Sequence, residues 1–122
     1  MATVRYMVRD VDAALPFYEA RGFTLTDRCG PPFAIVERSD LALWLSGPGT
    51  SAAKPMADGA KPESDGWNRV VIEVTDINAT AATLKSAGTR LRNEPISGPG
   101  GTQVLIEDPS GNPIEIFEAK KE

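Results

Sequence analysis

The chain has 122 residues, a formal net charge of −4, one cysteine and no histidine. This length fits one domain that folds without disulfides or metals, and the acidic balance argues against nonspecific nucleic-acid binding, which needs clustered basic side chains. Without histidine, a Ser-His-Asp triad, a zinc hydrolase site and a facial-triad iron site are all excluded from a single chain.

The first elements predicted along the chain are a strand and a helix. Residues 3–8 alternate between apolar and polar, which predicts a half-buried strand. Asp10 is a good N-cap for the helix, because its carboxylate can accept hydrogen bonds from the amides of the first turn. Pro16 is expected in about that first turn, where its missing N–H costs least, and Gly22 ends the helix. The apolar stripe of this helix consists of Val11, Leu15 and Tyr18.

Three further strands complete the first half, and an irregular segment follows them. The strands are predicted at residues 23–28, 33–38 and 41–46. Residues 47–66 are rich in Gly, Pro, Ser and Ala and have no periodicity. We interpret this segment as a linker that could fold over a site.

The second half repeats the first. Residues 71–89 align with residues 5–23 at a constant offset of 66, which pairs Asp10 with Asp76 and Gly22 with Gly88. Strands are again expected at residues 90–94, 102–108 and 114–119, with a turn at 108–112. The order βαβββ therefore occurs twice, and we predict an α+β fold. Within a single domain, residues 1–46 form the first module, 47–66 the linker and 67–122 the second module.

This order resembles the vicinal oxygen chelate superfamily, which includes glyoxalase, extradiol dioxygenases and bleomycin-resistance proteins. "VRDVDAALPFYEARGF" (8–23) resembles the first strand and helix of that family, and "EDPSGNPIEIFE" (107–118) resembles its closing hairpin. The resemblance implies that the two modules form a cupped mixed sheet with helices on its outer face. It also implies a metal held at four positions, two in each module.

Those four positions are occupied here by Thr3, Trp44, Arg69 and Glu115. Only Glu115 is a metal-ligand type, because an arginine donates hydrogen bonds only and an indole cannot coordinate a cation. We therefore expect no metal and no other cofactor, and we expect Glu115 to be a partner of Arg69. A carboxylate on a buried strand needs such a partner, since losing water unpaired is costly.

Strand alternation predicts a dry sheet face against the helices and a mixed face of charges and rings opposite it. For an arbitrary antiparallel sheet the mixed face would be solvated, but the resemblance makes it the concave, ligand-binding face. Phe33 and Trp67 lie near strand ends and are expected at its entrance. The predicted ligand-binding residues are Arg5, Met7, Phe33, Trp44, Trp67, Arg69, Glu73, Gln103, Leu105, Glu107, Glu115 and Phe117.

Two functions compete. The favoured one is a metal-free homodimer that resembles the bleomycin-resistance branch and sequesters a planar or amphipathic molecule, a cationic antibiotic included, in a dimer cleft. The alternative is a lyase or isomerase of the glyoxalase or epimerase kind, with Glu115 as general base and Arg69 stabilising an oxyanion. A neighbouring arginine stabilises the charged carboxylate and weakens it as a base, which favours binding. A module that serves a protein partner is the third possibility.

The expected compartment is the cytoplasm. The single cysteine, Cys29, forms no internal disulfide, which fits a reducing environment. The opening residues "MATVRYMVRD" lack the apolar segment of a signal peptide, and no stretch reaches the length of a membrane span. We therefore expect a small-molecule ligand and no membrane partner.

Overall fold

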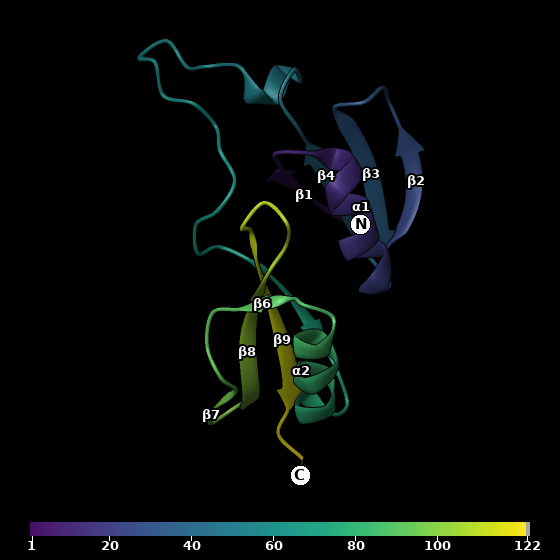
Figure 1. Ribbon diagram of the computed structural model, residues 1–122, viewed down its shortest axis with the longest axis vertical. Coiled ribbons are helices and arrows are strands. Elements are labelled where there is room, and N and C mark those ends of the chain that lie inside the picture. The colour runs from purple at the N-terminus through teal and green to yellow at the C-terminus, as the bar shows by residue number, and fades with distance from the viewer. Residues whose placement is uncertain (122) are drawn as a thin grey trace. The chain divides into compact units, whose positions relative to one another are not determined.

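The computed structural model describes residues 1–121 and divides into two compact units, Met1–Asp65 and Gly66–Glu122 (Figure 1). Both units contain a mixed β-sheet and one α-helix. The predicted α+β class is therefore confirmed. No helix within residues 1–121 is long and apolar enough to cross a bilayer.

The first unit contains a four-stranded sheet in the order β1-β4-β3-β2. Strands β1 and β4 are parallel, and the other pairs are antiparallel. The elements are β1 (Ala2–Met7), α1 (Val11–Ala20), β2 (Thr24–Arg28), β3 (Phe33–Arg38), β4 (Leu41–Ser46) and the short 3-10 helix η1 (Ser51–Ala53). Helix α1 contacts β2, β3 and β4.

Helix α1 begins where the sequence predicts. Asp10 Oδ1 accepts hydrogen bonds from the amides of Asp12 at 3.0 Å and Ala13 at 3.4 Å. Gly22 follows the helix with a φ of +87°, a conformation that glycine adopts without steric cost. The predicted apolar stripe is buried: Val11, Leu15 and Tyr18.

The structure corrects the position of Pro16. Helix α1 starts at Val11, so Pro16 lies beyond the first turn. Proline has no N–H to donate to the carbonyl four residues earlier, which is that of Asp12. Asp12 and Pro16 both lie on the exposed side of the helix, away from its buried stripe.

An aromatic cluster joins α1 to its sheet. The ring of Tyr18 is fully buried and makes edge-to-face contacts with Tyr6 at 6.5 Å, Phe17 at 5.0 Å and Phe23 at 5.6 Å between ring centroids. Such pairs contribute about 0.5–1.5 kcal/mol each beyond the burial of their area. The rings therefore fix which face of the sheet α1 covers.

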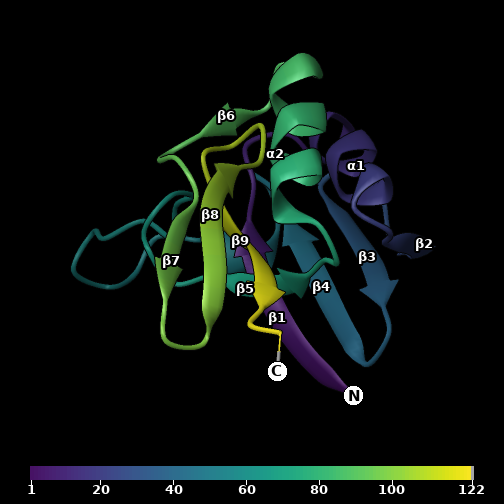
Figure 2. The same cartoon turned by 90° about the horizontal axis from the view of Figure 1, so that it is seen from below.

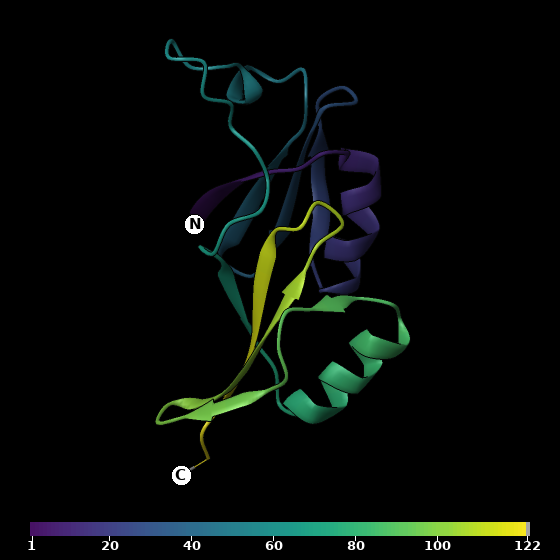
Figure 3. The same ribbon diagram turned by 60° about the vertical axis from the view of Figure 1, so that its left-hand side comes forward.

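The second unit has the strand order β5-β9-β8-β6, with β7 also paired to β8. Its elements are β5 (Val70–Glu73), α2 (Ile77–Ser86), β6 (Arg90–Leu91), β7 (Ile96–Gly98), β8 (Gly101–Glu107) and β9 (Pro113–Ala119). Figure 2 shows β7, β8 and β9 side by side, and Figure 3 shows α2 along one face of this sheet.

Helix α2 receives two caps. Asp76 Oδ1 accepts a hydrogen bond from the Ala79 amide at 3.0 Å, as the sequence predicts. Glu118 Oε1, from β9, accepts one from the Ile77 amide at 2.8 Å. The second cap ties the start of the helix to the last strand of the unit.

The predicted strand at residues 90–94 is wrong in its extent. Regular pairing covers only Arg90–Leu91, and a separate strand forms at Ile96–Gly98. Between them Asn93 Oδ1 accepts the Leu105 amide at 2.9 Å, so a side chain replaces a carbonyl as the partner of β8. Pro95 cannot donate to a strand ladder, which further explains the break.

The strand register supports the internal repeat. Arg5 of β1 lies opposite Trp44 of β4, and Val71 of β5 lies opposite Glu115 of β9. Since the offset of 66 relates Arg5 to Val71, Trp44 and Glu115 occupy equivalent places in their two sheets. One position of the repeat thus carries an indole in the first unit and a carboxylate in the second.

Candidate ligand-binding site

A cation and two rings lie together on the mixed face of the first sheet. The guanidinium carbon of Arg5 is 5.0 Å from the centroid of the Trp44 ring. The Phe33 ring meets the same indole edge to face at 6.1 Å. Arg5 Nη1 also donates to Ser46 Oγ at 3.0 Å, which holds the guanidinium in place. The structure therefore brings together three of the predicted residues, and we call Arg5, Phe33 and Trp44 the ring cluster.

The register of the strands produces the ring cluster. Parallel pairing sets Arg5 beside Trp44, and antiparallel pairing sets Phe33 beside Ser46. Residues two apart on a strand share a face, so all of these side chains point to the same side of the sheet. Arg5 is exposed and Trp44 is half-buried, so this surface is partly accessible to solvent.

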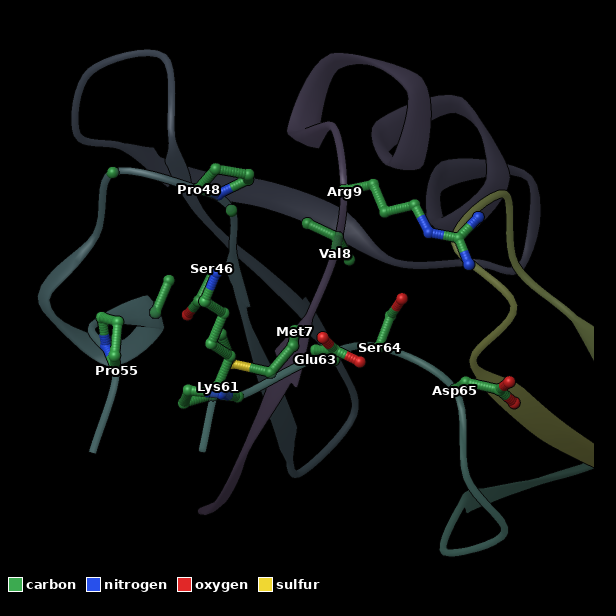
Figure 4. Close-up of a pocket in the computed structure, with 14 residues that line it drawn as sticks. Met7, Val8, Arg9, Ser46, Pro48, Pro55, Lys61, Glu63, Ser64 and Asp65 are labelled. Atoms are coloured by element: carbon green, nitrogen blue, oxygen red, sulfur yellow. The ribbon is translucent and has the colours of Figure 1, made fainter. Parts of the chain in front are cut away.

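A cavity of about 650 Å³ lies within the first unit, at the end of β1 and β4. Figure 4 shows Met7 and Ser46 from the strand ends, with Glu63 and Ser64 of the linker beside Met7. Met7 belongs to the predicted site, and Ser46 accepts the hydrogen bond from Arg5 that connects this cavity with the ring cluster. Volumes of 300–1,000 Å³ are typical of small-molecule pockets.

Most residues that line the cavity belong to the linker and were missed as site residues by sequence reasoning. They include Pro48, Pro55, Lys61, Pro62, Glu63 and Ser64. The only sequence signal was the Gly- and Pro-rich composition of residues 47–66. Composition indicated an irregular segment in a position to cover a site, but it could not say which side chains face inward.

In the second unit, Arg69 and Glu115 form the predicted ion pair. Arg69 Nε and Nη2 both donate to Glu115 Oε1, at 3.0 and 2.9 Å. The Glu115 side chain is only 10% exposed, whereas the Arg69 side chain is 27% exposed. Arg69 Nη1 donates in addition to the carbonyl of Trp67 at 3.2 Å. The arginine thus supplies the charge compensation that a carboxylate on this strand requires.

The second oxygen of Glu115 remains available. Oε2 accepts no hydrogen bond from the residues that the structure describes, 1–121. No buried side-chain oxygen or nitrogen in that part of the chain lacks a hydrogen-bond partner, so Oε2 must be reached by solvent. A carboxylate held rigidly through one oxygen can therefore offer the other to a hydrogen-bond donor.

Arg92, which the sequence prediction omitted, contacts both Glu107 and Trp67. Arg92 Nε donates to Glu107 Oε2 at 2.6 Å, and its guanidinium carbon is 4.6 Å from the centroid of the Trp67 ring. The same guanidinium donates to the carbonyls of Gly66 and Gly111 at 2.7 and 2.9 Å. Arg90 and Arg92 are two apart in a predicted strand, and that spacing was the available signal for a shared carboxylate partner.

The other predicted residues of the second unit lie on the mixed face around Glu115. Leu105 and Val71 are its neighbours on the adjacent strands. Phe117 lies two residues further along β9, and its neighbours on the adjacent strands are Glu73 and Gln103. Leu105 is buried, Gln103 and Phe117 are half-buried, and Glu73 is exposed.

The residues at the four metal positions implied by the resemblance do not fit a divalent cation. In the first unit they are Thr3 and Trp44, and the indole N–H is only a donor. In the second unit Arg69 occupies the place beside Glu115 with a fixed positive charge. Within residues 1–121, no three His, Cys, Asp or Glu side chains are grouped so as to hold a metal. The residues at these four positions therefore do not form a set of ligands for a divalent cation.

Comparison with known proteins agrees with the fold. Residues 1–116 match the model of the Glyoxalase/Bleomycin resistance protein/Dioxygenase superfamily, and the chain belongs to this superfamily. No curated protein sequence matches it significantly.

Among solved structures, the chain is similar to lactoylglutathione lyase from Agrobacterium tumefaciens, with 18% identity, a TM-score of 0.75, and coverage of 97% of this chain and 92% of the other. It is similar to TnmS3, an antibiotic-binding protein from Streptomyces sp. CB03234, with 25% identity, a TM-score of 0.73, and coverage of 98% and 95%. A superfamily member from Sphaerobacter thermophilus DSM 20745 has 23% identity, a TM-score of 0.75, and coverage of 97% and 95%.

Proposed function

We propose that this protein binds a planar or amphipathic small molecule without a metal and sequesters it without chemical conversion. The observation that carries the proposal is the ring cluster, in which Trp44 stands at a metal position of the family and is contacted by Arg5 and Phe33. The adjoining cavity has the volume of a drug-sized guest. The similarity to an antibiotic-binding protein supports an antibiotic as the guest.

The ring cluster suits a flat guest because stacking needs area and a fixed orientation. Trp44 and Phe33 supply the area, and aromatic pairs contribute about 0.5–1.5 kcal/mol beyond burial. Arg5 is already oriented by Ser46, so binding does not have to immobilise it. Both contacts of this cluster lie within the first unit, so the binding surface does not depend on the second unit.

A lyase or isomerase is the second candidate, because Glu115 Oε2 is an open oxygen that could take a proton from a substrate. Two features weaken it. Arg69 donates twice to Oε1 of the same carboxylate, so a guanidinium already occupies one side of the group that would have to act as the base. The likeness to lactoylglutathione lyase, at 18% identity, supports the fold and not the reaction.

Assembly as a homodimer remains a prediction, as does the cytoplasmic location. Large apolar side chains that are exposed in the second unit, Trp67, Val71 and Ile96, support a contact with another chain. Sedimentation equilibrium tests the dimer, and a monomer at micromolar concentration would rule it out. Cys29 is exposed and unpaired, which agrees with a reducing compartment.

A thermal-shift measurement combined with a turnover assay separates the two functions. Daunorubicin, a planar antibiotic with a basic amino sugar, is expected to raise the melting temperature of the protein. The stabilisation grows to about 2.7 kcal/mol at one hundred times the dissociation constant. The hemithioacetal of methylglyoxal and glutathione is expected to be unchanged by the protein. Turnover that disappears in Glu115→Gln, without a daunorubicin shift, would establish the lyase instead.

A further inference from the structure

The last part of the linker, Lys61–Ser64, borders the cavity of the first unit but is not bonded to its walls. Lys61, Pro62, Glu63 and Ser64 all line the cavity. None of these four residues forms a hydrogen bond with the residues that the structure describes, 1–121. We call this segment the linker arm. Segments without hydrogen bonds belong to the parts of a protein that open most easily.

The linker before the arm is, in contrast, held by hydrogen bonds. The Gly47 amide donates to the Pro32 carbonyl at 2.8 Å, and Thr50 Oγ1 donates to the Gly47 carbonyl at 2.8 Å. A side chain at Gly47 would bring its Cβ to 3.3 Å from the Pro32 carbonyl oxygen, a tight contact that the carbonyl would have to relieve by moving slightly. Further along, the Met56 amide donates to the Ala60 carbonyl at 2.7 Å. The fixed linker thus presents the arm at the cavity.

The chemistry of the walls defines the class of guest. Met7 and three prolines, at 48, 55 and 62, contribute apolar surface. The arm adds an ammonium group at Lys61 and a carboxylate at Glu63, and these two form no ion pair with residues 1–121. A guest with an apolar ring body, oxygen acceptors and a basic amine can satisfy both groups of the arm.

We propose that the cavity encloses such a guest and that the linker arm closes over it. The apolar body packs against Met7 and the prolines, Lys61 donates to the acceptor oxygens, and Glu63 binds the amine. The inference rests on the proposed function and deepens it, because it assigns the guest to this cavity and makes the arm a determinant of specificity. Opening of the arm gives the guest its route in and out.

Hydrogen exchange with daunorubicin as the probe tests the closure. In the free protein the amides of Lys61, Glu63 and Ser64 should exchange at nearly unprotected rates, because they have no acceptor. Saturating daunorubicin should slow them at least tenfold. The Ala60 amide, which donates to Asp58 Oδ1 at 3.0 Å, serves as the internal control and should change little.

Matched variants test the contacts. Glu63→Gln and Lys61→Gln should each weaken daunorubicin binding about three- to tenfold in calorimetry, whereas Lys54→Gln, in the same linker, should not. All three should melt like the wild type, because none of these side chains has a hydrogen bond to lose. If daunorubicin binds but the arm amides exchange as fast as in the free protein, and both arm variants bind it like the wild type, the inference is wrong and the proposed function stands. If daunorubicin does not bind, both are overturned.

Discussion

Glu115 Oε1 accepts two hydrogen bonds from Arg69, at 3.0 Å from Nε and 2.9 Å from Nη2. One end of the carboxylate is thereby neutralised and fixed, and the other stays open. This arrangement explains how a charged side chain is accommodated between Ile114 and Ile116, which are both buried. It also places a fixed positive charge beside the one metal-ligand residue type among the four positions that the resemblance implies.

The ion pair makes a first prediction. Arg69→Met should destabilise the protein by about 2 kcal/mol, because it leaves Glu115 without its cation in a largely buried place. Glu115→Gln should cost less, since the amide oxygen still accepts from Arg69. Urea unfolding of both variants and of the double variant measures the coupling free energy between the two side chains. Equal stabilities of wild type and Arg69→Met would mean that the pair does not form.

The two tryptophans allow a second prediction. Trp44→Leu should weaken daunorubicin binding up to about tenfold, because it removes the stacking ring from the ring cluster but keeps apolar volume. Trp67→Leu is the comparison variant and should weaken binding less, since Trp67 is 68% exposed and lies outside the ring cluster. Calorimetric titration measures both. A larger loss for Trp67→Leu would place the guest elsewhere.

The third prediction concerns two arginines that share Glu107. The Arg92 side chain is 11% exposed and lies 2.6 Å from the carboxylate, whereas that of Arg90 is 81% exposed and lies at 3.5 Å. Arg92→Lys should cost about 1–2 kcal/mol, because lysine cannot reproduce the several hydrogen bonds of the guanidinium. Arg90→Lys should change the free energy of unfolding by less than about 0.5 kcal/mol. Comparable losses of stability in the two variants would contradict the prediction that Arg92 contributes more than Arg90.

A fourth prediction tests the turn that leads into β9. Asp108 Oδ1 accepts from the amides of Ser110 and Asn112, both at 2.8 Å, and Oδ2 accepts from Asn112 Nδ2 at 3.0 Å. Asp108→Ala should destabilise by about 2–3 kcal/mol, because it leaves buried donors unpaired. Asp58→Ala, which removes an exposed turn bond to Ala60, should cost less than about 1 kcal/mol. Thermal unfolding of the two variants measures both losses of stability.

The sequence predicts the fold well where local chemistry and periodicity agree. Asp10 and Asp76 cap helices as expected, and the offset of 66 between the two halves reappears in the bounds of the helices, Val11–Ala20 and Ile77–Ser86. The pairing of Arg69 with Glu115 could be predicted because few partners suit a carboxylate on a buried strand.

The parts of the fold and of the site that were not predicted depend on contacts that sequence periodicity does not encode. Residues 90–94 read as one strand, but Asn93 and Pro95 interrupt it, and Arg92 turns to Glu107 and Trp67. The cavity escaped prediction for a related reason. Its walls come from a linker whose conformation is set by single hydrogen bonds, such as the one between Gly47 and Pro32, rather than by a repeating pattern.

The most direct test of metal-free binding is a calorimetric titration with daunorubicin before and after dialysis against EDTA, with the metal content of the untagged protein measured alongside. We predict a substoichiometric metal content and the same affinity in both titrations, since Trp44 and Arg69 stand where ligands would be needed. One equivalent of bound metal, together with loss of binding after chelation, would contradict the account.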